Sequence, residues 1–209
     1  MTNSASPGAT PRTALFLDRD GIINEDTGHV HRIEAFRFRA GIFDLCAAAR
    51  ARGLVLVVVT NQAGIGRGLY TERDFRALTD WMLARFAERD IQFASVEHCP
   101  DHPVHGIGAY RRENVRRKPG PGMILDAAAA HGLDLPRSLM LGDRASDMEA
   151  ALAAGVGTRI LLPASPDEVR RAPAGTVVLA PDALPHLAAA LSRQDWRGAL
   201  QRIAEGAIV

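Results

Sequence analysis

The stretch that most constrains the fold is a short apolar run, residues 14–17, which leads directly into Asp18 and Asp20 and then a glycine. Such a run, bounded by turn residues, is typical of a strand buried on both faces of a parallel sheet. Ligands of these sheets bind beyond the carboxyl ends of the strands, where Asp18 would lie. Side chains alternate along a strand, so the two carboxylates can point the same way and would repel each other unless a cation such as Mg²⁺ lay between them. Taken alone, the stretch also fits a strand end with ordinary surface aspartates.

Two further apolar runs end in polar groups. Residues 54–59 are six consecutive aliphatic residues, followed by Thr60, Asn61 and a glycine-rich turn, and residues 138–141 end at Gly142-Asp143. Hydroxyl and amide groups beside the backbone N–H groups of such a turn suit an anion such as phosphate. A plain strand-to-helix turn is the alternative for each run.

Strands and helices alternate along the chain, which predicts an α/β fold with a doubly wound parallel sheet. The expected helices are 40–52, 71–90, 123–131, one ending at 155, and 182–192, and the further strands are 91–97, 158–162 and 176–180. Residues 22–38 and 98–117 are expected as irregular loops and 163–175 as a surface connection. The expected organisation is a disordered tail (1–12), one domain (13–193) and a C-terminal extension (194–209).

Lysine and arginine together number 25, and only one of them, Lys118, is lysine. Lysine is a compact point charge that arginine does not replace in tight phosphate sites. Pro119 and Pro121 hold Lys118 in an extended segment before a helix. Three buried strands that end in carboxylates and a hydroxyl, with this lysine nearby, predict a phosphoryl-transfer site.

Bulk properties narrow the class of protein. A chain of 209 residues suffices for one well-packed domain. A formal net charge of +1 argues against a nucleic-acid or membrane-surface binder, and no apolar run approaches the length of a membrane span. Two cysteines give no disulfide framework, which favours the cytoplasm. We expect a monomer whose partner is a small phosphorylated metabolite, not nucleic acid or membrane.

With these motifs the chain resembles the haloacid dehalogenase superfamily of phosphatases. The four signature motifs are Asp18-x-Asp20, Thr60, Lys118 and Gly142-Asp143-x-x-x-Asp147. Longer strings, at 17–24, 58–67 and 117–123, are similar to the D-glycero-D-manno-heptose bisphosphate phosphatases and their histidinol-phosphate phosphatase relatives. The resemblance runs from about residue 13 to 192 and implies a haloacid dehalogenase fold that is essentially capless.

The resemblance implies a role for each motif residue. Asp18 would attack phosphorus to form an aspartyl-phosphate, and Asp20 would protonate the leaving oxygen and then activate water. Thr60 and Lys118 would hold the phosphoryl oxygens. Mg²⁺ would be bound by Asp18, the backbone carbonyl of Asp20, and Asp143.

The resemblance also implies residues around the catalytic group. Asp147 would orient Lys118 or a metal-bound water. Arg144 stands where the family usually has lysine. The expected substrate-binding residues are Asp26, Thr27, Gly28, His29, Asn61, Gln62, Ala63, Arg117 and Arg144.

The loop at 98–117 departs from the family pattern. Relatives commonly bind a structural zinc there through a Cys-x-His pair and a Cys-x-Cys pair. Here the first pair reads Cys99-x-Asp101, with His102 one place further on, and the second pair (114–116) has no cysteine. Structural zinc needs four ligands, so we do not expect zinc; its candidate ligands would be Cys99 and His102, with His105 or Asp101. The alternative is a loop ordered by hydrogen bonds, with a substrate that is harder to infer.

Three functions remain in view. The first is a Mg²⁺-dependent phosphatase acting on the C7 phosphate of a heptose 1,7-bisphosphate, whose second phosphate suits the arginines at 111, 112 and 116, unless these are solvated surface. The second is the same chemistry on histidinol phosphate or another sugar phosphate. The third, a non-catalytic binding protein, predicts decay of the motif residues, yet all of them are intact.

Overall fold

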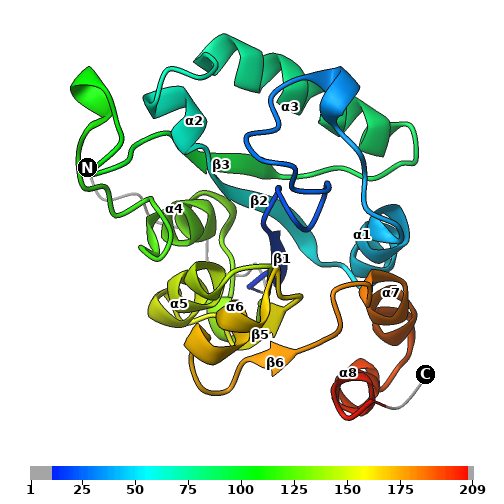
Figure 1. The fold of residues 1–209 in the computed structure, drawn as a ribbon. Coiled ribbons are helices and arrows are strands. Elements are labelled where there is room, and N and C mark those ends of the chain that lie inside the picture. Colours follow the sequence, from blue (N-terminus) through cyan, green and yellow to red (C-terminus); the bar gives the residue numbers. More distant parts are fainter. Residues whose placement is uncertain (1–10, 207–209) are drawn as a thin grey trace, which may run out of the picture.

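A computed structural model describes residues 11–206 of the chain and shows one six-stranded parallel sheet between two layers of helices (Figure 1). The strand order is β3-β2-β1-β4-β5-β6. The strands are β1 (Ala14–Leu17), β2 (Val55–Asn61), β3 (Ser95–Cys99), β4 (Leu139–Gly142), β5 (Thr158–Leu161) and β6 (Val177–Val178). This confirms the predicted doubly wound α/β fold. Because Leu17 aligns with Val58 on one side and Leu141 on the other, the three central strands end at the same edge.

The helices cover both faces of the sheet (Figure 1). They are α1 (Ile42–Ala51), α2 (Ala63–Gly66), α3 (Glu72–Ala87), α4 (Gly122–His131), α5 (Ala145–Ala154), α6 (Pro166–Arg171), α7 (Leu184–Ser192) and α8 (Trp196–Ala204). Alternation along β1 divides the core: Leu15 and Leu17 pack with α1, α3, α7 and α8, whereas Ala14 and Phe16 pack with α4 and α5. Burial on both faces explains why the sequence of β1 is entirely apolar.

The predicted strand at 91–97 is shifted. Asp90 has a positive φ of 57°, and the first sheet hydrogen bond after it runs from Ala94 N–H to the Leu56 carbonyl. Ile91 is buried as part of the core rather than as part of a strand. The apolar start of this segment therefore reflects the burial of Ile91, and the strand itself begins at Ser95.

The connection at 163–175 contains a helix, α6, that the sequence analysis did not predict. Pro166 at its first position, acidic residues in its first turn and Arg170 and Arg171 in its last turn are helix signals that would have identified it.

The expected tail (1–12) lies mostly outside the described residues. Arg12, at its end, forms backbone hydrogen bonds with Gly132 and Asp134. Arg12 is therefore part of the folded domain and not of a disordered tail.

The loops at 22–38 and 98–117 are largely irregular, as predicted; each contains one 3₁₀ turn, Ile33–Ala35 and Gly108–Tyr110, and the first two residues of the second loop belong to β3. The second loop is tied to the body of the protein through Ile107 N–H, which donates to the Gly66 carbonyl at 2.7 Å. No helix between residues 11 and 206 has both the length and the apolar character to cross a membrane.

Candidate active site

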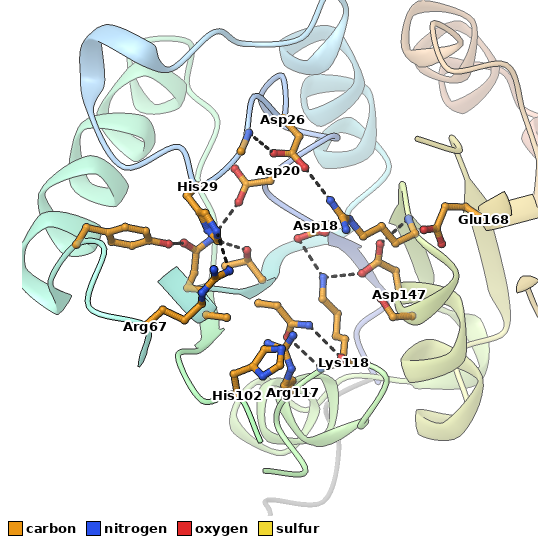
Figure 2. A pocket seen from close by; sticks show the side chains of 18 of the residues that line it. Asp18, Asp20, Asp26, His29, Arg67, His102, Arg117, Lys118, Asp147 and Glu168 are labelled. Atoms are coloured by element: carbon orange, nitrogen blue, oxygen red, sulfur yellow. Dashed lines mark hydrogen bonds and ion pairs between the residues drawn. The ribbon is translucent and has the colours of Figure 1, made fainter. Parts of the chain in front are cut away.

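A cavity of about 510 Å³ opens at the edge where the strands end (Figure 2). Asp18 follows β1, and its N–H donates to the Leu141 carbonyl at 3.0 Å. Asp143 follows β4, and Lys118 lies in the segment before α4. The predicted residues that line the cavity are Asp18, Asp20, Asp26, Gly28, His29, Thr60, Asn61, Gln62, Ala63, Arg117, Lys118, Arg144 and Asp147. The fold thus brings together residues separated by more than a hundred positions.

Lys118 is buried among carboxylates. Its Nζ lies 3.0 Å from Asp18 Oδ1 and 2.7 Å from Asp147 Oδ1, and it donates to the Val59 carbonyl at 2.8 Å. Burial opposes the ammonium charge, but Asp147 and Asp18 outweigh burial and raise the pKa of Lys118 to about 12. The Asn61 amide holds the backbone of Lys118 through two hydrogen bonds of 3.0 Å, so it positions the lysine. Of the two roles predicted for Asp147, orienting Lys118 or a metal-bound water, this contact fits the first.

Three buried carboxylates, those of Asp18, Asp143 and Asp147, offer oxygens within 4.8 Å of one another. Within residues 11–206 no other group of three or more aspartate, glutamate, histidine or cysteine side chains lies so close. Burial, together with the neighbouring carboxylates, raises the pKa of Asp18 to about 7, although Lys118 opposes the rise, and that of Asp143 to about 8. Asp143 Oδ1 has no hydrogen-bond partner among the described residues. This group offers several oxygen ligands, and Lys118 alone does not balance its three carboxylates, so it fits a hard divalent cation.

The glycine after the two aspartates is required by this packing. Gly21 has a φ of +82°, and any Cβ at this position would overlap the carboxylate of Asp143. A backbone turn therefore closes one side of the carboxylate group.

The side chain of Asp20 does not belong to that group. Arg19, only 1% exposed, donates to both of its oxygens at 2.8–3.2 Å, and Asn24 Nδ2 donates to Oδ1 at 3.0 Å. Gln62 Nε2 donates to Oδ2 at 3.1 Å. Asp20 is therefore held at the cavity wall by four neighbouring N–H groups, and its backbone carbonyl as a metal ligand stays a prediction.

Gln62 was predicted to contact substrate, but it is 1% exposed and its amide is bound to protein groups. Nε2 also donates to Thr60 Oγ1 at 2.9 Å, and Oε1 accepts from the Tyr70 hydroxyl at 2.6 Å. Gln62 therefore lines the cavity, but its amide is bound to Asp20, Thr60 and Tyr70.

Charged side chains surround the mouth of the cavity. Arg144 pairs with Asp26 at 2.9 Å, and Arg67 NH1 lies 3.2 Å from His29 Nε2 (Figure 2). Thr27 was predicted to bind substrate, but it is exposed and does not line the cavity. The cavity residues that sequence reasoning did not place there are Arg67, Tyr70, His102, Ser146, Glu168 and Arg171. Arg67 had a sequence signal, a basic residue within the glycine-rich turn, whereas Glu168 and Arg171 belong to the unpredicted α6.

The loop at 98–117 is held by hydrogen bonds. Asp101 is fully buried, and its Oδ2 accepts from Arg112 Nε at 2.8 Å and Asn114 Nδ2 at 2.5 Å. Cys99 is buried at the end of β3, whereas His102 lines the cavity. The candidate zinc ligands are therefore not gathered with a third ligand anywhere in the described part of the chain.

Comparisons with known proteins agree with this geometry. A HAD-hydrolase-like family model matches residues 115–179. The D-glycero-alpha-D-manno-heptose-1,7-bisphosphate 7-phosphatase of Burkholderia mallei is 55% identical over 149 residues, 71% of this chain and 79% of the relative. The corresponding beta-anomer phosphatase of Vibrio cholerae is 49% identical over 151 residues, 72% and 81% of the two chains. A D,D-heptose 1,7-bisphosphate phosphatase from B. bronchiseptica, crystallised with magnesium and phosphate, superposes with a TM-score of 0.74 at 28% identity, covering 86% of this chain and 97% of that one.

Proposed function

Because the chain belongs to the D-glycero-D-manno-heptose-1,7-bisphosphate 7-phosphatase family of the haloacid-dehalogenase-like hydrolases, we propose that it removes the C7 phosphate of a heptose 1,7-bisphosphate. The observation that carries the proposal is the meeting of Asp18, Lys118 and the buried carboxylate group at the floor of one cavity. Mg²⁺ is the proposed cofactor, as the relative crystallised with magnesium suggests.

In the first step, a carboxylate oxygen of Asp18 attacks phosphorus. The bond between phosphorus and the sugar oxygen breaks, and Asp20 gives its proton to that oxygen. Thr60 and Lys118 hold the transferring phosphoryl oxygens, where negative charge must be offset. The products are the heptose with one phosphate fewer and a phosphorylated Asp18.

In the second step, Asp20 takes a proton from a water molecule that attacks the same phosphorus. The bond from phosphorus to Asp18 breaks, which restores the carboxylate and releases inorganic phosphate. Asp18, Asp143 and the backbone carbonyl of Asp20 would hold Mg²⁺, with Asp147 beside them. When bound, the ion offsets the charge of the buried carboxylates and of the phosphate.

The mouth of the cavity supports a substrate with a second anion. Arg67, Arg117 and Arg144 line the cavity from three different segments, and Figure 2 shows Arg67, Arg117 and His102 on the same side of it. His102 Nδ1 accepts hydrogen bonds from two backbone N–H groups of its own loop. A neutral His102 ring therefore carries its hydrogen on Nε2, and this N–H group can donate to an anion. Such a rim suits a second phosphate better than the ammonium group of histidinol phosphate.

The test is phosphate release from both anomers of heptose 1,7-bisphosphate, beside histidinol phosphate, with Mg²⁺ and again with EDTA. We expect EDTA-sensitive turnover that favours a heptose anomer, and none from Asp18→Asn. Turnover only of other phosphates would overturn the substrate assignment, and no turnover of any phosphomonoester would overturn the enzyme itself.

We also propose that residues 13–193 form one catalytic domain, that 194–209 form an extension to it, and that the protein acts as a cytoplasmic monomer. Both cysteines are unpaired, which suits a reducing compartment. Light scattering of the purified protein measures its molar mass in solution and so tests whether it is a monomer.

A further inference from the structure

A buried amide links the two groups that the proposed reaction needs at opposite ends of the bond to be broken. Gln62 Nε2 lies 3.1 Å from Asp20 Oδ2 and 2.9 Å from Thr60 Oγ1. Asp20 serves the leaving oxygen, and Thr60 serves the transferring phosphoryl group. One NH₂ group therefore contacts both the proton donor and the phosphoryl-binding hydroxyl.

The orientation of this amide is determined by its neighbours. The Asp20 oxygens accept hydrogen bonds from Arg19 and Asn24, and the NH₂ end of Gln62 faces this same carboxyl group as a further donor. The oxygen end then faces the Tyr70 hydroxyl, which donates to it at 2.6 Å. Burial raises the pKa of Tyr70 to about 12, so the hydroxyl keeps the proton that it donates. Tyr70 is itself 6% exposed and stacks on the His31 ring at a centroid distance of 4.9 Å.

We propose that Gln62, oriented by Tyr70, is a positioning residue that aims the Thr60 hydroxyl and the Asp20 carboxyl at the substrate phosphate. The inference rests on the proposed phosphatase function and adds to it two residues with no chemical step of their own. Because Thr60 Oγ1 accepts from Gln62, the hydroxyl hydrogen is free to point away from Gln62, towards a phosphoryl oxygen. Because Asp20 Oδ2 accepts from the same amide, the carboxyl is held against the cavity wall at a set angle.

The matched variants are Tyr70→Phe, which removes one oxygen atom, and Gln62→Leu, which keeps the size of the side chain and removes the amide. Tyr110→Phe is the control, because it changes the chain's other tyrosine, which does not line the cavity. Circular dichroism and thermal melting confirm that each variant is folded. If Gln62→Leu does not fold, Tyr70→Phe carries the test alone.

The readout is kcat/KM on two esters that differ in leaving group. A heptose phosphate needs a proton from Asp20 as it leaves, whereas p-nitrophenyl phosphate has a leaving group stable as an anion. Proton donation by a positioned acid contributes about 10²–10⁴-fold, so even partial misplacement of Asp20 is visible on the sugar ester. We expect Tyr70→Phe and Gln62→Leu to lose about tenfold or more on the sugar ester, and several-fold less on the aryl ester.

A double variant tests whether Tyr70 acts through Gln62. If it does, adding Tyr70→Phe to Gln62→Leu causes no further loss, whereas independent sites would give additive losses. Equal losses on the two esters, or additive losses in the double variant, would overturn the inference while leaving the phosphatase intact. Wild-type protein that hydrolyses neither ester would overturn the proposed function and the inference with it.

Discussion

Replacing Asp143 by asparagine should abolish turnover and yet stabilise the protein in the absence of metal. Burial, followed by the charges of Asp18 and Asp147, raises the pKa of Asp143 from 3.8 to about 8. A carboxyl group with a higher pKa in the folded state binds protons more tightly there, so stability falls as pH rises from about 4 to about 8. At about 1.4 kcal/mol per pKa unit, the reduction in the free energy of unfolding at pH 7.5 is at most ~5 kcal/mol.

Asparagine has the same size, carries no charge and can donate to the neighbouring carboxylates. Because Asp18 titrates together with Asp143, we expect the Asp143→Asn substitution to recover part of that free energy, about 1–3 kcal/mol. In urea, with an m-value of about 2 kcal/mol/M, this raises the unfolding midpoint by about 0.5–1.5 M.

The assay is urea unfolding at pH 7.5 in EDTA, repeated at pH 5 and with Mg²⁺. At pH 5 the difference between variant and wild type should shrink, because wild-type Asp143 is protonated in the folded state. With Mg²⁺ at a hundred times its dissociation constant, the wild type gains about 2.7 kcal/mol, which offsets most or all of the variant's advantage. Asp182→Asn, at an exposed position, should leave the midpoint unchanged. A variant less stable than wild type in EDTA at pH 7.5 would refute the reasoning.

Three further predictions follow from the same contacts. Lys118→Met should abolish turnover and lower the free energy of unfolding by about 3–5 kcal/mol in EDTA at pH 7.5, because Asp18 and Asp147 stay buried without their cation; an unchanged urea midpoint would contradict this. Asp101→Asn should raise KM for the bisphosphate several-fold and change kcat by less than about twofold, because it loosens a cavity wall and not the catalytic group; steady-state kinetics measure the split, and a lower kcat at constant KM would oppose it. Mg²⁺ should bind more tightly as pH rises from 6 to 8, because the raised carboxyl pKa values make binding release protons; calorimetry in two buffers counts them, and proton uptake would count against the prediction.

The central strands could be predicted from sequence because they are buried on both faces. The apolar runs at 14–17, 54–59 and 138–141 lie within two residues of the observed strands. β3 was misplaced because it is an edge strand with partly exposed polar residues, while Ile91, in the more apolar segment before it, is buried without pairing. The hydropathy pattern of a sequence reports which residues are buried. In an edge strand, the residues that pair with the sheet need not be the residues that are buried.

The site was predictable where a residue's own chemistry identifies it. Asp18, at a strand end, and Lys118, a lone lysine among arginines, were expected to converge at one edge of the sheet, and they form an ion pair there. The hydrogen bond between Gln62 and Tyr70 was not predictable, because it joins residues on either side of a turn through no periodic pattern. The same holds for the two hydrogen bonds between the Asn61 amide and the backbone of Lys118.

The lone lysine gives the protein a built-in chemical reporter. An amine-reactive reagent has only Lys118 and the chain's α-amine to modify, and the folded protein keeps the Nζ of Lys118 buried, protonated and paired with two aspartates. Acylation of this amine therefore requires the cavity floor to open and the proton to leave. The rate of labelling at Lys118, followed by mass spectrometry, measures how often the catalytic centre comes apart while the rest of the chain stays folded.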